Sequence, residues 1–160
     1  LKQYAKLVKK FKKNKNSKII FEPGRFIIGN TAILIAKVIY IKKSNNKNFI
    51  ILDAGMNNMM RPALYNADHQ IIPLKKTNKT FKGNVEFVGP VCESTDKFST
   101  HKSFFKIKEG DFVALLNVGA YGMSLSSNYN TRPIIAEIMV SGSKHKVIRK
   151  RQSLENLVNN

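Results

Sequence analysis

The sequence predicts a mainly β domain, a sandwich or barrel, preceded by one helix and one strand of a parallel α/β structure. Two observations carry this fold class. Residues 1–13 place apolar side chains three and four positions apart, and a short apolar run follows at 19–21, which is one helix–strand repeat. From about residue 31, short runs rich in Ile, Val, Phe and Tyr alternate with turn signals, which favours a β-sandwich or barrel.

The N-terminal segment predicts an amphipathic helix and then a buried strand. The apolar stripe of the helix consists of Leu1, Tyr4, Leu7, Val8 and Phe11. The run IIF at 19–21 predicts the buried strand. Because the chain begins with Leu and its first helix has no preceding structure to pack against, we expect it to be cut from a longer protein.

Six further runs predict strands, and a short helix closes the chain. The strand runs are residues 33–41, 49–53, 85–91, 111–117, 134–140 and 144–149. The sequence Ser-Gly-Ser at 141–143 predicts a hairpin between the last two. Ser153 is the expected N-cap of a helix that ends at Val158.

The chain is strongly basic, with 28 Lys and Arg against 10 Asp and Glu and a formal net charge of +18. Most of this charge is Lys mixed with Asn and Ile, as in residues 42–48, a pattern typical of exposed positions encoded by an A/T-rich genome. A small basic nucleic-acid-binding β-domain, with residues 144–151 as its contact strip, is one alternative function. Trp is absent and no aromatic-rich strand accompanies the strip, so we expect no nucleic-acid partner.

The remaining composition points to a cytoplasmic protein without metal or membrane contacts. Cys92 is the only cysteine, so an intramolecular disulfide is impossible and a reducing compartment is expected. The three histidines are far apart and stand beside no cluster with metal-ligand spacing. The longest apolar stretch, 31–41, is interrupted by Lys37 and is too short to span a bilayer.

Four short segments place a charge, thiol or phenol beside Gly or Pro: EPGR at 22–25, RPALY at 61–65, GPVCE at 89–93 and GAYG at 119–122. Taken in this order, and together with DAGMN at 53–57, ESTD at 93–96 and SSNYNTRP at 126–133, they resemble the fold-type III basic amino-acid decarboxylases. The similarity runs from about residue 4 to residue 158 and is greatest to the diaminopimelate decarboxylases.

The resemblance implies a two-domain organisation and a cofactor. Residues 1–30 would be the last helix and strand of a pyridoxal-phosphate-binding (β/α)₈ barrel, and residues 31–160 the C-terminal β-domain. Pyridoxal 5'-phosphate withdraws electrons from the α-carbon while its ring nitrogen stays protonated. By resemblance, Glu22 holds that proton, Gly24 offers a backbone N–H to the phosphate, and Arg25 and Tyr121 contact the cofactor.

The resemblance also implies substrate-binding residues for meso-diaminopimelate, which carries an ammonium and a carboxylate far from the reacting carbon. Arg25 and Arg61 supply planar forks for carboxylate, which Lys cannot match. Glu93 would accept the distal ammonium. Related ornithine-type enzymes carry Asp at that position, so Glu93 favours diaminopimelate. Tyr65 and Tyr121 would add contacts to the substrate.

Cys92 resembles the proton donor of the family, which is delivered from the neighbouring subunit of a homodimer. The Schiff-base lysine of the family has no counterpart here, so we expect the chain alone to be inactive. A fragment, one half of a split gene that pairs with a separate barrel-half chain, and a degraded remnant are the explanations left open. A non-catalytic homologue that regulates a partner is a second alternative function. Exposed apolar residues on the barrel segment predict poor solubility.

Overall fold

The computed structural model describes residues 1–13 and 15–159 and consists of a curled β-sheet, a separate hairpin and four short helices. Residue 160, the last of the predicted β-domain, lies outside the described residues. The strands are β1 (Leu34–Ser44), β2 (Lys47–Leu52), β3 (Ile71–Pro73), β4 (Asn84–Val88), β5 (Lys97–His101), β6 (Phe112–Leu115), β7 (Glu137–Ser141) and β8 (Lys144–Arg149). The helices are α1 (Lys2–Lys12), α2 (Gly24–Ile28), α3 (Arg61–Tyr65) and α4 (Leu154–Val158).

The main sheet has six strands in the order β3-β6-β1-β2-β4-β5, and β7 pairs with β8 in a separate two-stranded sheet. All neighbouring strands of the main sheet are antiparallel except β2 and β4, which are parallel. The mainly β fold class is therefore confirmed. The core lies against one face of this sheet, and its largest fully buried apolar side chains are Val38, Ile50, Leu52, Met59, Val85, Phe87, Val113 and Leu115.

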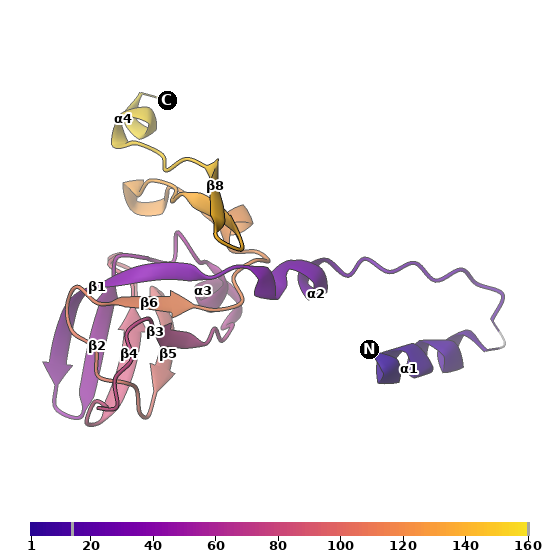
Figure 1. The fold of residues 1–160 in the computed structure, drawn as a ribbon, viewed down its shortest axis with the longest axis horizontal. Coiled ribbons are helices and arrows are strands. Elements are labelled where there is room, and N and C mark those ends of the chain that lie inside the picture. Colours follow the sequence, from indigo (N-terminus) through magenta and orange to yellow (C-terminus); the bar gives the residue numbers. More distant parts are fainter. Residues whose placement is uncertain (14, 160) are drawn as a thin grey trace.

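Side-chain alternation in β1 shows that one face of this strand is buried, while its backbone pairs with β2 and β6. Leu34, Ala36 and Val38 are buried, whereas Ile35 and Lys37 between them are exposed, which is the two-residue period of a strand with one buried face. Beyond Val38 the pairing with β2 shifts register, and such an irregularity bends a strand. The bend agrees with the curled form of the sheet (Figure 1).

The N-terminal segment stands apart from the sheet in Figure 1: α1 lies at its start, and residues 15–23 form a long extended run that leads to α2, which adjoins the sheet. The predicted helix over 1–13 is confirmed as α1, but the prediction of a buried strand at 19–21 is wrong. No strand is assigned there, and Ile20 and Phe21 are 73% and 51% exposed. A strand needs a hydrogen-bonded neighbour, and within the described chain this run has none beside it (Figure 1).

Exposed apolar side chains mark the N-terminal segment. Leu7, Phe11 and Ile20 are 68%, 60% and 73% exposed, which agrees with the exposed apolar surface predicted for this segment. The hairpin at 141–143 is confirmed, with Gly142 at a φ of 58° between β7 and β8. The closing helix is confirmed as α4, in which Ser153 Oγ accepts a hydrogen bond from the backbone N–H of Asn156 at 3.0 Å.

Candidate functional site

Three loops converge at one edge of the main sheet. They follow β2, β4 and β6 and contain residues 53–60, 89–96 and 118–132. Because β2 and β4 are parallel and both β2 and β6 are antiparallel to β1, all three strands run in the same direction. Their carboxyl ends, and the loops that follow, therefore lie at the same edge of the sheet.

Hydrogen bonds tie these loops together. The backbone N–H of Met56 donates to Asp96 Oδ1 at 2.6 Å, which joins the first loop to the second. The backbone N–H of Ser127 donates to the carbonyl of Asn57 at 3.0 Å, and Ser126 Oγ donates to the carbonyl of Asn58 at 3.2 Å, which join the third loop to the first. The three loops thus form one connected framework.

Arg61 lies close to two other predicted site residues, Tyr65 and Tyr121. Its guanidinium lies 5.8 Å from the centre of the Tyr65 ring and 5.7 Å from the centre of the Tyr121 ring, which is within the range of cation–π attraction. Arg61 begins helix α3 and Tyr65 ends it. Both tyrosines are exposed, at 62% and 48%. The two tyrosines are therefore on the surface, and Arg61 beside them is half-buried.

The loop that carries Tyr121 has an unusual backbone. Tyr121 adopts a φ of 58°, a left-handed conformation that is uncommon for residues other than Gly, Asn and Asp. A Cβ on Gly119 would lie 2.0 Å from the carbonyl oxygen of Ile28, so only glycine lets this loop approach the end of α2 so closely. The N–H of Gly119 also donates to the carbonyl of Gly29 at 3.0 Å. The contact places the Tyr121 loop beside α2.

Residues 22–25 lie just before and at the start of α2. Glu22, Gly24 and Arg25 are all exposed. The N–H of Gly24 donates to the carbonyl of Glu22 at 2.9 Å, and the space in which a side chain on Gly24 would lie is open to 4 Å. These three residues are thus on the surface of the described chain, on a segment joined to the Tyr121 loop through Gly29 and Gly119.

Cys92 and Glu93 lie on the second loop. The Cys92 thiol is free and exposed, and Glu93 is partly buried. Glu93 Oε1 accepts from Ser94 Oγ at 3.4 Å, and Oε2 accepts from Tyr129 Oη at 3.3 Å. The backbone N–H of Thr95, followed by these hydroxyl groups, holds the pKa of Glu93 below its usual value. The loop therefore presents a thiol beside an ionised carboxylate.

The carboxylate of Asp96 accepts hydrogen bonds that hold this loop in place. Its side chain is buried, and Oδ2 accepts a hydrogen bond from the backbone N–H of Val91 at 2.7 Å. Burial raises the pKa of Asp96 above its usual value, although the amides of Val91 and Met56 and the charge of Arg132 act in the opposite direction. Arg132 Nη2 in turn donates to the carbonyl of Asp53 at 2.5 Å.

Sequence reasoning assigned no role to Asp96, Tyr129 or Arg132, although all three fall in the segments 93–96 and 126–133 that contributed to the family resemblance. Each makes a contact between loops that are distant in the chain. The available signal was their polar character within Gly-, Asn- and Pro-rich segments, where side chains commonly fix the backbone.

A cleft of about 520 Å³ separates α3 from the end of the second loop and β5. Pro62 and Ala63 form one wall, and Ser94 and Thr95 form part of the other. Because Pro62 follows Arg61 and Ser94 follows Glu93 in the chain, the cleft lies between the segment with the Arg61 cluster and the segment with Glu93.

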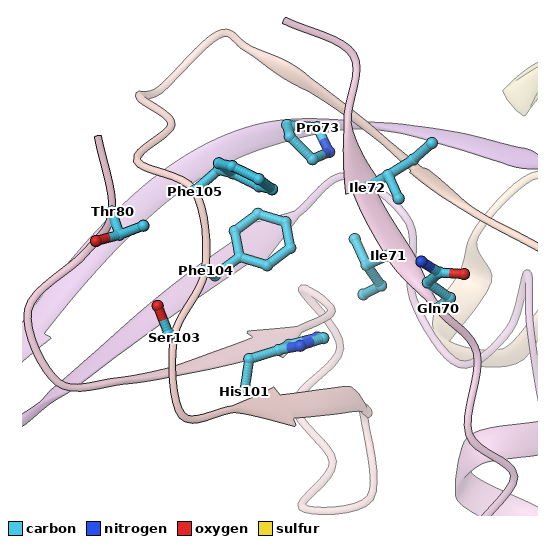
Figure 2. A pocket seen from close by; sticks show the side chains of 9 residues that line it. All are labelled: Gln70, Ile71, Ile72, Pro73, Thr80, His101, Ser103, Phe104 and Phe105. Carbon is cyan, nitrogen blue, oxygen red and sulfur yellow. The ribbon is translucent and has the colours of Figure 1, made fainter. Parts of the chain in front are cut away.

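A second cavity, of about 390 Å³, lies between β3 and the segment that follows β5. In Figure 2, Phe104 and Ile71 point into it, and His101 lies at its lower side. Burial lowers the pKa of His101, and its ring lies 5.7 Å and 5.3 Å from those of Phe87 and Phe104. These aromatic contacts indicate a structural histidine, and the cavity is lined by none of the predicted site residues.

Two negative findings apply to residues 1–13 and 15–159. No group of three or more His, Cys, Asp or Glu side chains among them is placed to hold a metal ion. Within the same ranges, no helix has the length and apolarity required to cross a membrane.

Comparison with known proteins decides the family. The model of the pyridoxal-dependent decarboxylase C-terminal sheet domain matches residues 25–119, which is more than half of the chain. This chain belongs to that family. The match contains the loops that carry Arg61, Tyr65, Cys92 and Glu93, and it ends two residues before Tyr121.

Relatives named diaminopimelate decarboxylase match over nearly the whole chain. The protein from Zymomonas mobilis is 45% identical over 155 residues, covering 97% of this chain and 36% of the relative. The protein from Aquifex aeolicus is 44% identical over 154 residues, covering 96% and 36%. The crystal structure of the Helicobacter pylori enzyme complexed with L-lysine matches with a TM-score of 0.86 at 41% identity, covering 98% and 38%. The chain therefore spans little more than a third of the relatives it matches.

Proposed function

We propose that this chain is the substrate-recognition part of a diaminopimelate decarboxylase, which converts meso-2,6-diaminopimelate to L-lysine and CO₂. The observation that carries the proposal is the cluster of half-buried Arg61 with the exposed Tyr65 and Tyr121. A planar guanidinium beside two phenol groups is suited to bidentate recognition of a carboxylate. The identity of 45% and 44% to relatives of that name supports the same activity.

The substrate requires recognition at both of its ends, and the loops offer groups of both charges. Arg61 and Arg25 would bind carboxylate groups, with Tyr65 and Tyr121 donating hydroxyl hydrogen bonds. The carboxylate of Glu93, kept ionised by the backbone N–H of Thr95, would accept the distal ammonium. Charge-assisted hydrogen bonds of this kind give selectivity because an analogue without the distal group leaves them unmade.

Pyridoxal 5'-phosphate is the cofactor of this proposal, and when bound it would supply the electron-withdrawing ring on which decarboxylation depends. The donor set of this chain fits the cofactor: a carboxylate at Glu22 for the ring nitrogen, a cation at Arg25 and a hydroxyl at Tyr121. The open space beside Gly24 leaves the backbone there accessible to a phosphate. The Schiff-base lysine and most of the phosphate-binding loop would come from the barrel portion.

Cys92 would donate the proton that completes the reaction. A proton donor must be accessible to the reacting carbon, and the Cys92 thiol is free and exposed. We assign this thiol to the active site of the neighbouring subunit of a homodimer, so that each site uses residues of two chains. In the same proposal, residues 1–30 belong with the barrel, residues 31–160 form the β-domain, and the enzyme works in the cytoplasm.

The proposal is tested by restoring the missing portion. The chain is fused behind the part of the Zymomonas mobilis relative that it does not cover, and lysine formation from meso-diaminopimelate is measured with added pyridoxal phosphate. We expect lysine from the fusion and none from the chain alone. Arg61→Ala in the fusion is the control and should lose most of the activity. A fusion that binds pyridoxal phosphate but forms no lysine would contradict the proposal.

A further inference from the structure

The carboxylate of Glu93 has one hydrogen-bond partner that comes from a distant part of the chain. Ser94 and Thr95, which donate to it, follow it directly. Tyr129 Oη donates to Glu93 Oε2 at 3.3 Å from 36 residues further along. The orientation of this carboxylate relative to the rest of the site therefore depends on the position of Tyr129.

The backbone around Tyr129 is held on both sides. Tyr129 begins a 3₁₀ turn, η3 (Tyr129–Thr131), and its N–H donates to Ser127 Oγ at 3.3 Å. The side-chain Nδ2 of Asn128 donates to the carbonyl of Arg132 at 2.9 Å and to Gln152 Oε1 at 2.6 Å. Because the preceding residues are also bonded to the 53–60 loop, the ring of Tyr129 projects from a fixed base although it is itself 47% exposed.

The turn after Tyr129 is strained. Asn130 and Thr131 adopt φ values of 57° and 55°. Asn tolerates this left-handed region, but a β-branched residue such as Thr is a true outlier there. Backbone strain of this kind persists only where surrounding contacts enforce it, and it concentrates at functional sites. This supports a specific role for the side chains that the turn delivers.

We propose that Tyr129 is a positioning residue that fixes the Glu93 carboxylate for the distal ammonium of the substrate. The inference rests on the role of Glu93 in the proposed function. A neutral hydroxyl occupies one lone pair of Oε2 and leaves the others for the ammonium. Without it, Glu93 would keep only its local partners, Ser94 and Thr95, and its carboxylate would be free to adopt other orientations.

The charges around Glu93 come from its own loop and from the third loop. Asp96 is a nearby acid whose charge interacts with that of Glu93, and Arg132 is the cation that faces Asp96. Tyr129 lowers the pKa of Glu93, after the larger effect of the Thr95 amide. Removal of the hydroxyl should therefore move the titration of Glu93 to higher pH.

The first test uses the chain by itself and does not depend on any enzymatic activity. The side-chain carboxyl carbons of the six glutamates are followed by ¹³C NMR as a function of pH, and Glu93→Gln identifies the Glu93 signal. We expect Tyr129→Phe to shift the Glu93 midpoint to higher pH. Tyr40→Phe, at an exposed position of β1, is the matched control and should leave it in place. An unchanged midpoint in Tyr129→Phe would overturn the proposal.

The second test uses the fusion with the restored barrel. Tyr129→Phe should raise KM for meso-diaminopimelate about tenfold, near the lower end of the effect of one hydrogen bond to a charged group, with kcat changed less than about twofold. Combined with Glu93→Gln, it should add almost nothing. A fall in kcat as large as the rise in KM would refute the positioning role. An effect of Tyr129→Phe that adds in full to that of Glu93→Gln would refute it as well. If the wild-type fusion forms no lysine, the proposed function fails, and the NMR titration still decides the role of Tyr129.

Discussion

The carboxylate of Asp96 occupies the space in which a side chain on Gly89 would lie. A Cβ built on Gly89 would be 2.2 Å from Asp96 Oδ2, and the N–H of Gly89 donates to the carbonyl of Asp96 at 2.9 Å. The same carboxylate accepts N–H groups from Val91 and Met56. Asp96 thus closes the loop that presents Cys92 and joins it to the neighbouring loop.

Gly89→Ala should therefore destabilise the protein and displace the loop. The methyl group would force the Asp96 carboxylate away from the N–H groups it accepts, and overpacking of this kind costs about 1–3 kcal/mol. The free energy of unfolding from urea titration measures the loss. Gly24→Ala is the control, because nothing lies within 4 Å of its Cβ position. An equal change in the two variants would contradict the role given to Asp96.

The β-domain was largely predictable because its strands carry their own signal. The apolar runs at 33–41, 49–53, 85–91 and 111–117 correspond to β1, β2, β4 and β6, with boundaries that differ by a few residues. β3 and β5 were missed. β5 (Lys97–His101) has one buried apolar side chain, Phe98, and is a strand because β4 pairs with it. That pairing is a tertiary contact, which no local pattern contains.

The site was predictable only in part. The family resemblance identified Arg61, Tyr65 and Tyr121, and the structure places them in one cluster. The family resemblance could not predict the contact of Tyr129 with Glu93. That contact depends on the left-handed turn after Tyr129 and on the common direction of the three strands. Such geometry depends on the complete sheet.

Glu86 should make the stability of the protein sensitive to acid. It is buried on β4 between Lys47 of β2 and Lys97 of β5, with which it forms ion pairs. Burial acts to raise the pKa of Glu86, but the two lysines together lower it below its usual value. A folded-state pKa below the unfolded one contributes stability that is present above the unfolded pKa and lost as the pH falls through the folded pKa.

Urea unfolding of the wild type and Glu86→Gln over a range of acid pH checks this. At neutral pH the variant should be less stable, because two lysines lose their buried partner. As the pH falls below about 4, the ordinary range of a glutamate, the difference between the two proteins should shrink. Glu155→Gln, in α4, is the control. A constant difference at every pH would exclude Glu86 as a source of acid sensitivity.

Arg61→Lys should impair recognition although it keeps the charge. An ammonium is a point charge that cannot bind a carboxylate bidentately, and its contact with the rings of Tyr65 and Tyr121 would be weaker. In the fusion with the restored barrel we expect KM for meso-diaminopimelate to rise about tenfold or more, which corresponds to about 1.4 kcal/mol. Steady-state kinetics measures the change. A lysine variant with the wild-type KM would show that bidentate recognition by Arg61 is unnecessary.

Cys92 and Glu93 are adjacent in the chain but should fail in different ways when each is replaced by alanine in the same fusion. Loss of a general acid acts on the transition state, so Cys92→Ala should lower kcat by about 10²–10⁴-fold with little change in substrate affinity. Loss of Glu93 removes the acceptor for the distal ammonium, so Glu93→Ala should mainly reduce discrimination against substrate analogues without that group. Equal losses of kcat and of discrimination in both variants would mean that the two roles are assigned incorrectly, because one disturbed loop would then account for both.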